Sequence, residues 1–149
     1  MLSLESEARS VRVTPIGVTL TLRASDSNDS IHMMIGFPEG QSIARGMRHE
    51  TPDRPLVHDL FKAFLERNGW RAQKVLIRDE REGTFLADLT LQKDDETQVF
   101  DARPSDALAI AIRFGAKIYV NQQVLEQHRK SESPDDKGQE PSKSDSLHL

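Results

Sequence analysis

A short stretch in the second half of the chain, residues 101–106, places polar side chains in front of an apolar segment. Asp101, Arg103, Ser105 and Asp106 precede the run Ala-Leu-Ala-Ile-Ala-Ile, which has no polar face. Carboxylates are oxygen ligands for a divalent ion, whereas an arginine and a helix N-terminus bind anions such as phosphate. Phosphodiester cleavage uses both, because a metal ion activates water while cations hold the phosphate. A structural interpretation stays open, in which Ser105 and Asp106 only start a helix and Arg103 pairs with an acid.

Four more side chains are candidates for the same chemistry, and each also has an ordinary structural explanation. His58 lies near the start of an amphipathic segment and is a candidate for moving a proton. Glu82 lies in a predicted hairpin turn and Asp88 in the strand after it, where simple solvation also explains an acid. Arg113 interrupts the apolar run near its end, where it complements a helix C-terminus or reaches out along the surface.

These residues give a set of expected roles. The predicted catalytic residues are Asp106, Asp101, His58 and Glu82. The predicted phosphate-binding residues are Arg103, Ser105 and Arg113. The predicted metal ligands are Asp101, Asp106 and Asp88, and the expected cofactor is a divalent ion, Mg²⁺ first. The chain contains no cysteine, so a thiolate metal site and a disulfide framework are both excluded.

The elements that must position these residues follow from hydrophobic periodicity. Alternating residues predict strands at 11–13, 18–22, 31–35, 74–78, 85–92, 97–102 and 118–120. Helices are predicted at 39–49, 55–68, 104–115 and 122–129. Gly69 is expected to close the second helix, and Asn121 to cap the last. The mixture predicts an α+β fold with mixed or antiparallel sheets and packed helices.

The chain repeats its own pattern when it is shifted by 67 residues. Residues 19–22 then fall on 86–89, and Glu39 falls on Asp106. Sequence identity is low, so chance alignment of two strand–helix units is the alternative explanation. The pattern predicts two similar strand-strand-strand-helix halves that face each other across a shared core.

Composition bounds the kind of protein. The 149 residues are 36% hydrophobic and 30% charged, which is typical of one folded domain. Residues 131–149 are rich in serine, proline and charge, so we expect a folded domain at 1–130 and a disordered tail. No apolar run reaches the roughly 18 residues that a membrane helix needs, and the N-terminus has no signal-peptide pattern. We therefore expect a cytoplasmic protein without membrane contact.

Three segments, in this order and spacing, resemble the bifunctional nuclease domain family. They are RPLVHDL (54–60), EGTFLADL (82–89) and DARPSDALAIAIRFGAKIYV (101–120). The stretch IGFPEGQSIA (35–44) is similar to the family's first helix start, although Gly40 replaces the usual alanine, which would loosen that helix. The resemblance covers about residues 10–128. It implies a compact α+β fold, cleavage of DNA and RNA, and a homo-oligomer, most simply a twofold dimer.

Two functions remain open from the sequence. The first is a metal-assisted nuclease in which Arg103 contacts phosphate and His58 moves a proton. The second is a non-catalytic module that binds a small anion or a protein, with Arg103 and Ser105 as its receptor. The net charge of −4 and the few aromatic residues favour the second function, because nucleic-acid binders usually carry basic surfaces and stacking rings. The family resemblance favours the first.

Overall fold

The computed structural model describes residues 2–131 and 146–148, and its elements have the predicted types and places. The strands are β1 (Ser3–Thr14), β2 (Gly17–Ala24), β3 (Ser30–Ile35), β4 (Arg71–Arg81), β5 (Thr84–Lys93), β6 (Glu96–Ala102), β7 (Lys117–Asn121) and β8 (Ser146–His148). The helices are α1 (Phe37–Met47), α2 (Val57–Arg67), α3 (Pro104–Arg113) and α4 (Gln122–Ser131). The predicted α+β class is confirmed.

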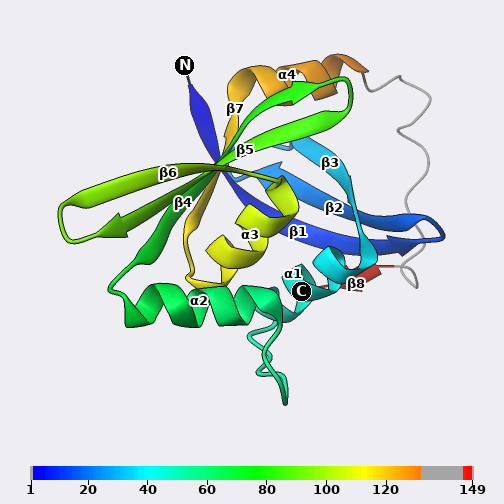
Figure 1. Cartoon of the computed structure of the whole chain (residues 1–149). Helices are drawn as coiled ribbons and strands as arrows, with labels where there is room; N and C mark the ends of the chain where they lie inside the picture. The colour runs from blue at the N-terminus through cyan, green and yellow to red at the C-terminus, as the bar shows by residue number, and fades with distance from the viewer. Residues whose placement is uncertain (1, 132–145, 149) are drawn as a thin grey trace.

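One mixed sheet contains all the described strands, in the order β3-β2-β1-β7-β4-β5-β6, with β8 beside β1. The pair β4–β7 is parallel and the other described pairs are antiparallel. The order places two three-stranded meanders on either side of β7, and each meander leads into a helix (Figure 1). The shift of 67 residues carries Phe37 at the start of α1 onto Pro104 at the start of α3. The predicted repeat is confirmed.

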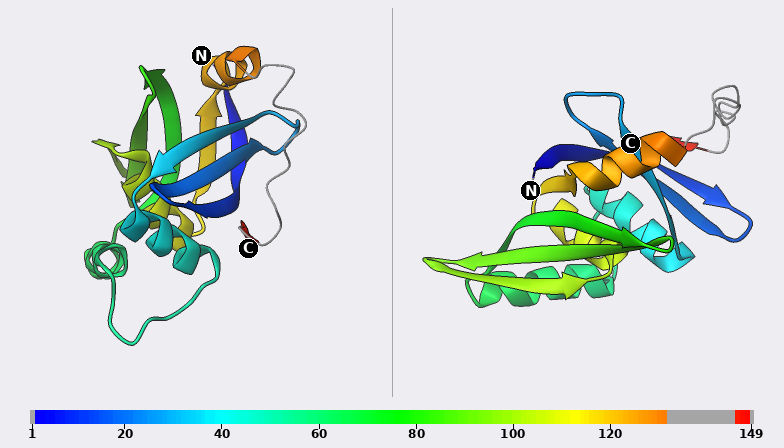
Figure 2. Two further views of the ribbon diagram at one scale, coloured as in Figure 1. Left: turned by 90° about the vertical axis from the view of Figure 1, so that its right-hand side faces the viewer. Right: turned by 90° about the horizontal axis from the view of Figure 1, so that it is seen from above.

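Helix α3 lies in the middle of the core. Its residues 107–111 are all buried, and they pack between the sheet and the neighbouring helices α1 and α2. Three of these five residues are alanines, which allow close approach of the neighbouring backbones. Both halves contribute to the single apolar cluster, and α4 adds Val124 and Leu125 to it from the opposite end of the molecule to α2 (Figure 2).

Helix ends follow the local sequence. The Asn121 side-chain oxygen accepts a hydrogen bond from the Gln123 N–H at 3.0 Å, so the predicted cap of α4 is confirmed. Gly69 follows α2 with a φ of 79°, a conformation that glycine adopts without strain. Gly40 has a packing role, because a Cβ atom there would lie 2.7–2.8 Å from the Val18 side chain in β2.

The predicted boundary at residue 130 falls next to the end of α4. Of the tail predicted to be disordered, residues 132–145 and 149 lie outside the described residues. Residues Ser146–His148 form β8, which pairs with residues 10–12 of β1. Within the described residues, no helix is both long enough and apolar enough to cross a bilayer.

Candidate functional site

The first turns of α1 and α3, one from each half, meet at one place on the surface. Each helix has a proline near its start, and neither receives a side-chain hydrogen bond at its first turn. Uncapped N–H groups and the helix dipole make such a place favourable for negative charge. Each first turn carries one acid, Glu39 in α1 and Asp106 in α3. These two acids are equivalent under the repeat.

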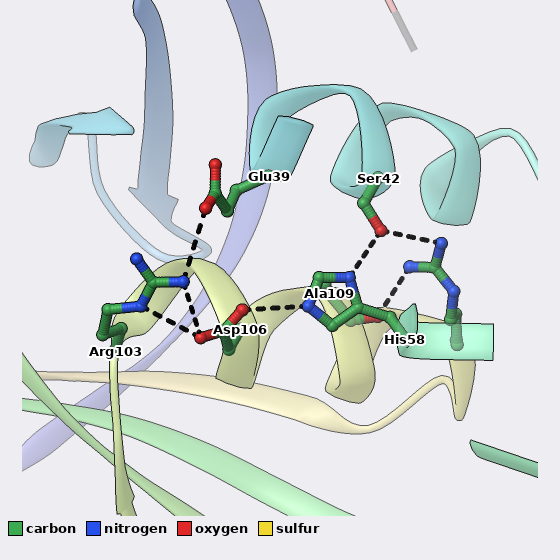
Figure 3. A network of polar contacts seen from close by, with 7 residues as sticks. Glu39, Ser42, His58, Arg103, Asp106 and Ala109 are labelled. Atoms are coloured by element: carbon green, nitrogen blue, oxygen red, sulfur yellow. Dashed lines mark hydrogen bonds and ion pairs between the residues drawn. The ribbon is translucent and has the colours of Figure 1, made fainter. Parts of the chain in front are cut away.

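Arg103 joins the two acids. Its Nη2 lies 3.3 Å from Glu39 Oε1, and both Nε and Nη2 lie 3.0 Å from Asp106 Oδ2 (Figure 3). The predicted pairing of Arg103 with Asp106 is confirmed. The Arg103 side chain is 67% exposed, so one guanidinium neutralises two carboxylates while keeping a solvent-facing surface.

A buried histidine and serine lie behind Asp106. His58 Nε2 lies 3.0 Å from Asp106 Oδ1, and His58 Nδ1 lies 2.6 Å from Ser42 Oγ (Figure 3). Ser42 Oγ also accepts a hydrogen bond from Arg113 Nη2 at 3.0 Å. The assignment that satisfies all three contacts has the serine hydroxyl donating to Nδ1 and Nε2–H donating to Asp106. The histidine is 6% exposed and Ser42 3%, so solvent reaches the network only through Asp106.

Arg113 holds the three helices together beneath this network. Its side chain is 6% exposed, and its Nε donates to Asp59 Oδ1 at 2.8 Å. Its Nη1 donates to the Ala109 carbonyl at 3.0 Å, and Nη2 donates to Ser42. All three nitrogens are therefore engaged inside the protein, which makes this arginine a structural link among α1, α2 and α3.

Two aspartates of the network have lowered pKa values. Burial raises the pKa of Asp106, but hydrogen bonds from His58 and Arg103 outweigh burial and bring the pKa below the ordinary 3.8. Burial likewise raises the pKa of Asp59, and hydrogen bonds from Arg113 and the Leu56 N–H outweigh it. Both carboxylates are consequently ionised at neutral pH.

A second polar cluster lies on the sheet. Asp88 of β5 and Asp101 of β6 are register partners, and both bind Arg78 of β4. The Arg78 Nη1 atom lies 2.5 Å from Asp88 Oδ1 and 3.0 Å from Asp101 Oδ1. The predicted metal ligands are thus divided, because Asp106 contacts Arg103 instead. Among residues 2–131 and 146–148, no group of three or more His, Asp or Glu side chains is arranged to hold a metal ion.

Two predicted site residues join neither cluster. Glu82 is exposed in the β4–β5 turn, and no hydrogen bond or ion pair between described residues includes it. Ser105 is buried in the first turn of α3, so in this conformation its hydroxyl does not face solvent. The sequence analysis did not select Glu39 or Ser42 as site residues. The repeat held the signal for Glu39, since it aligned that residue with Asp106.

Comparisons with known proteins agree on one family. Residues 20–133 match the family model described as the bifunctional nuclease domain. An uncharacterized protein of Mycobacterium tuberculosis is 39% identical over 108 residues, which are 72% of this chain and 64% of the relative. Bifunctional nuclease 2 of Oryza sativa subsp. japonica is 26% identical over 124 residues, 80% of this chain and 38% of the relative. Bifunctional nuclease of Oryza minuta is 29% identical over 110 residues, 70% of this chain and 33% of the relative. The chain therefore spans less than two thirds of these relatives.

Proposed function

The chain belongs to the bifunctional nuclease domain family, and from this premise we propose that it hydrolyses phosphodiester bonds of DNA and RNA at the paired starts of α1 and α3. The observation that carries the proposal is Arg103, an exposed guanidinium fixed by Glu39 and Asp106 in front of two uncapped helix starts. A guanidinium beside free N–H groups recognises phosphate, because both kinds of donor match its oxygens. The names of the rice relatives support the choice of substrate.

The proposed roles follow from exposure and charge. Arg103 binds the phosphate. Asp106 is 36% exposed and ionised, which suits it to orient an attacking water or to hold a cation. His58 is too buried to touch substrate, so its proposed role is to position Asp106 by holding one carboxylate oxygen.

The proposal includes a divalent ion. Mg²⁺ at phosphoryl sites commonly takes one or two protein carboxylates, and substrate oxygens and waters complete its shell. Two carboxylate pairs have that number: Glu39 with Asp106, and Asp88 with Asp101. Each pair already shares an arginine, so an ion there competes with a guanidinium. When bound, such an ion would polarise the phosphate and acidify a water.

A nuclease assay on single- and double-stranded DNA and RNA, with EDTA or added Mg²⁺, tests the proposal. We expect Arg103→Ala to lower cleavage by roughly 100-fold, the usual cost of losing one electrostatic donor. The matched control is Arg9→Ala, which removes an exposed arginine paired with Glu7 on another strand. The control should cleave like the wild type. Equal cleavage by all three proteins would assign the activity to a contaminating host nuclease and refute the proposal.

A non-catalytic anion-binding module is the second candidate. It is favoured by the completeness of the network, since each acid in it already has a cationic or hydrogen-bonding partner without a substrate. In that case the purified protein would bind phosphate through Arg103 but would cleave no nucleic acid, with or without Mg²⁺.

We also propose a homo-oligomer, most simply a twofold dimer. Helix α2 exposes Val57, Leu60, Phe61 and Phe64, and Phe100 of edge strand β6 lines the same apolar groove as Phe61 and Phe64. Exposed apolar surface of this kind commonly marks an interface, and twofold dimers are the commonest assembly. Light scattering should give twice the chain mass of 16.8 kDa, and Phe64→Glu should reduce it to one chain. Ile16→Glu, an equally exposed apolar position in the β1–β2 turn, is the matched control.

A further inference from the structure

We propose that a cationic pocket at the start of β4 and β7 binds the phosphate backbone of single-stranded nucleic acid. The pocket has a volume of about 500 Å³. Its charged lining residues are Arg71, Lys74 and Lys117, and no acid lines it. This inference deepens the proposed nuclease function and rests on it, because it adds a place where the substrate is held away from the cleavage site.

The strand register brings two lysines together. Lys74 of β4 and Lys117 of β7 are direct partners in the parallel pair. Their neighbours Val75 and Ile118 are buried in the core, so by the alternation of strands both lysines project from the opposite face of the sheet. Like charges at neighbouring strand positions repel each other. A bound anion would remove that repulsion.

The protein itself neutralises this pair only weakly. Among residues 2–131 and 146–148, no carboxylate forms an ion pair with Lys74, and Lys117 Nζ lies 3.9 Å from Glu5 Oε2, near the limit for an ion pair. Asp88 is the register partner of Leu76, two residues along from Lys74, but it is paired with Arg78. The pocket therefore keeps its positive charge.

Aromatic rings favour nucleic acid over a free anion. Phe114 and Tyr119 also line the pocket, and both are half-buried, so part of each ring is accessible. The Lys62 ammonium lies 5.6 Å from the centre of the Phe114 ring, which adds a further cation beside the pocket. Basic side chains with stacking rings are the usual combination for binding single strands, because the rings take the bases and the cations take the backbone.

The pocket and the candidate active site lie at opposite ends of α3. Phe114 follows the last residue of the helix and Arg103 precedes the first. A helix rises about 1.5 Å per residue, so the two places are roughly 16 Å apart along the axis. A strand of several nucleotides has enough length to occupy both. The pocket would thus contribute binding energy remote from the scissile bond.

Binding of a fluorescent 20-nucleotide single-stranded DNA of mixed sequence, followed by anisotropy in EDTA at low salt, tests the inference. The full chain is compared with the double variant Lys74→Gln/Lys117→Gln. The matched control is Arg9→Gln/Lys93→Gln, which removes the same charge outside the pocket. We expect the Kd to rise about tenfold in the pocket variant and less than twofold in the control. The slope of log K against log salt should fall by about 1.4 in the pocket variant, since each single-strand phosphate contact contributes about 0.7.

Other outcomes overturn the inference and also separate it from the proposed function. Equal weakening in both double variants would show that only overall charge matters. Competition by polyglutamate or by inorganic phosphate as strong as that by unlabelled oligonucleotide would assign the pocket to an acidic peptide or a free anion. Arg103→Ala should bind the oligonucleotide within twofold of the wild type while failing to cleave it. Normal binding by the pocket variant, with cleavage by the wild type, would refute the pocket alone. Binding through the pocket without any cleavage would refute the nuclease alone.

Discussion

The two halves of the protein share an architecture but differ in chemistry where α1 meets α3. Under the shift of 67 residues, Gly36 corresponds to Arg103 and Gly46 corresponds to Arg113. At both ends of the helix pair, the second half therefore supplies an arginine and the first half supplies a glycine. Each arginine reaches across to α1: Arg103 binds Glu39, and Arg113 binds Ser42.

The glycines are what make room for this arrangement. A Cβ atom at Gly46 would lie 2.9 Å from Arg113 Nη1. One at Gly36 would lie 2.4 Å from the Glu39 carboxylate, the group that binds Arg103. The first half also leads into α2, which brings His58, whereas in the second half α3 leads directly into β7. A repeated architecture thus produces one asymmetric site, because the two copies have divided the cations and the space between them.

Replacing the buried arginine should break the comparison most strongly. We expect Arg113→Met to lower the free energy of unfolding by about 3 kcal/mol, because it leaves the Asp59 carboxylate and the Ser42 hydroxyl without their donor. Urea denaturation measures this change. Arg103→Met at the exposed end of the same helix is the matched control and should leave the urea midpoint nearly unchanged. Equal losses from the two substitutions would contradict the distinction between a structural and a functional arginine.

Filling the glycine of the first half should have the next largest effect. Ala107 occupies the position in α3 that Gly40 occupies in α1. We expect Gly40→Ala to destabilise the protein by about 2 kcal/mol, since the added methyl group overlaps Val18. Helix propensity alone predicts the opposite sign, a gain of about 1 kcal/mol. Combining the change with Val18→Ala should cost less than the sum of the two single changes, and a stabilising Gly40→Ala would show that packing does not require the glycine.

Removing the charge of Asp106 separates its structural and functional roles. Because its partner Arg103 is exposed, Asp106→Asn leaves a solvated cation, and we expect a loss of only about 1 kcal/mol. Cleavage should nevertheless fall at least tenfold, because asparagine keeps the shape but not the charge. Glu39→Gln, the same change in the other half, is the comparison and should have a smaller effect on cleavage, since Glu39 has no contact with His58. Full cleavage by Asp106→Asn would rule out its role in the reaction.

The pH dependence of stability should show the smallest effect. The pKa values of Asp59 and Asp106 are lowered by folding, so the unfolded chain binds more protons as the pH falls. The stability they contribute is present above the ordinary pKa of 3.8 and is lost as the pH falls through their lowered values. Unfolding measured from about pH 5 to about pH 2 should show a shallower decline in Asp59→Asn than in the wild type. An unchanged slope would show that the Arg113 pair does not control this carboxylate.

Much of the fold was predictable, because its signals are local. Alternation and amphipathic spacing located the strands and helices, and the shift of 67 residues revealed the two halves before any coordinates. The pairing of Arg103 with Asp106 was predictable for the same reason, since three residues separate them across a helix start. The Asn121 cap is equally local.

The rest of the site depends on contacts between residues far apart in the chain. His58 meets Asp106 across 48 residues, and Arg113 meets Asp59 across 54. No periodicity encodes such meetings, because they depend on how α1, α2 and α3 pack.

The acids show most clearly what the sequence determined and what only the tertiary structure decided. Asp101 and Asp106 are five residues apart, and the sequence grouped them as metal ligands. Strand register instead places Asp101 beside Asp88 and Arg78, while the helix start directs Asp106 to His58 and Arg103. The sequence by itself determined which residues carry charge and which elements hold them. Only the packing of the sheet and helices decided which charges meet, because direction in space changes sharply where a strand gives way to a helix.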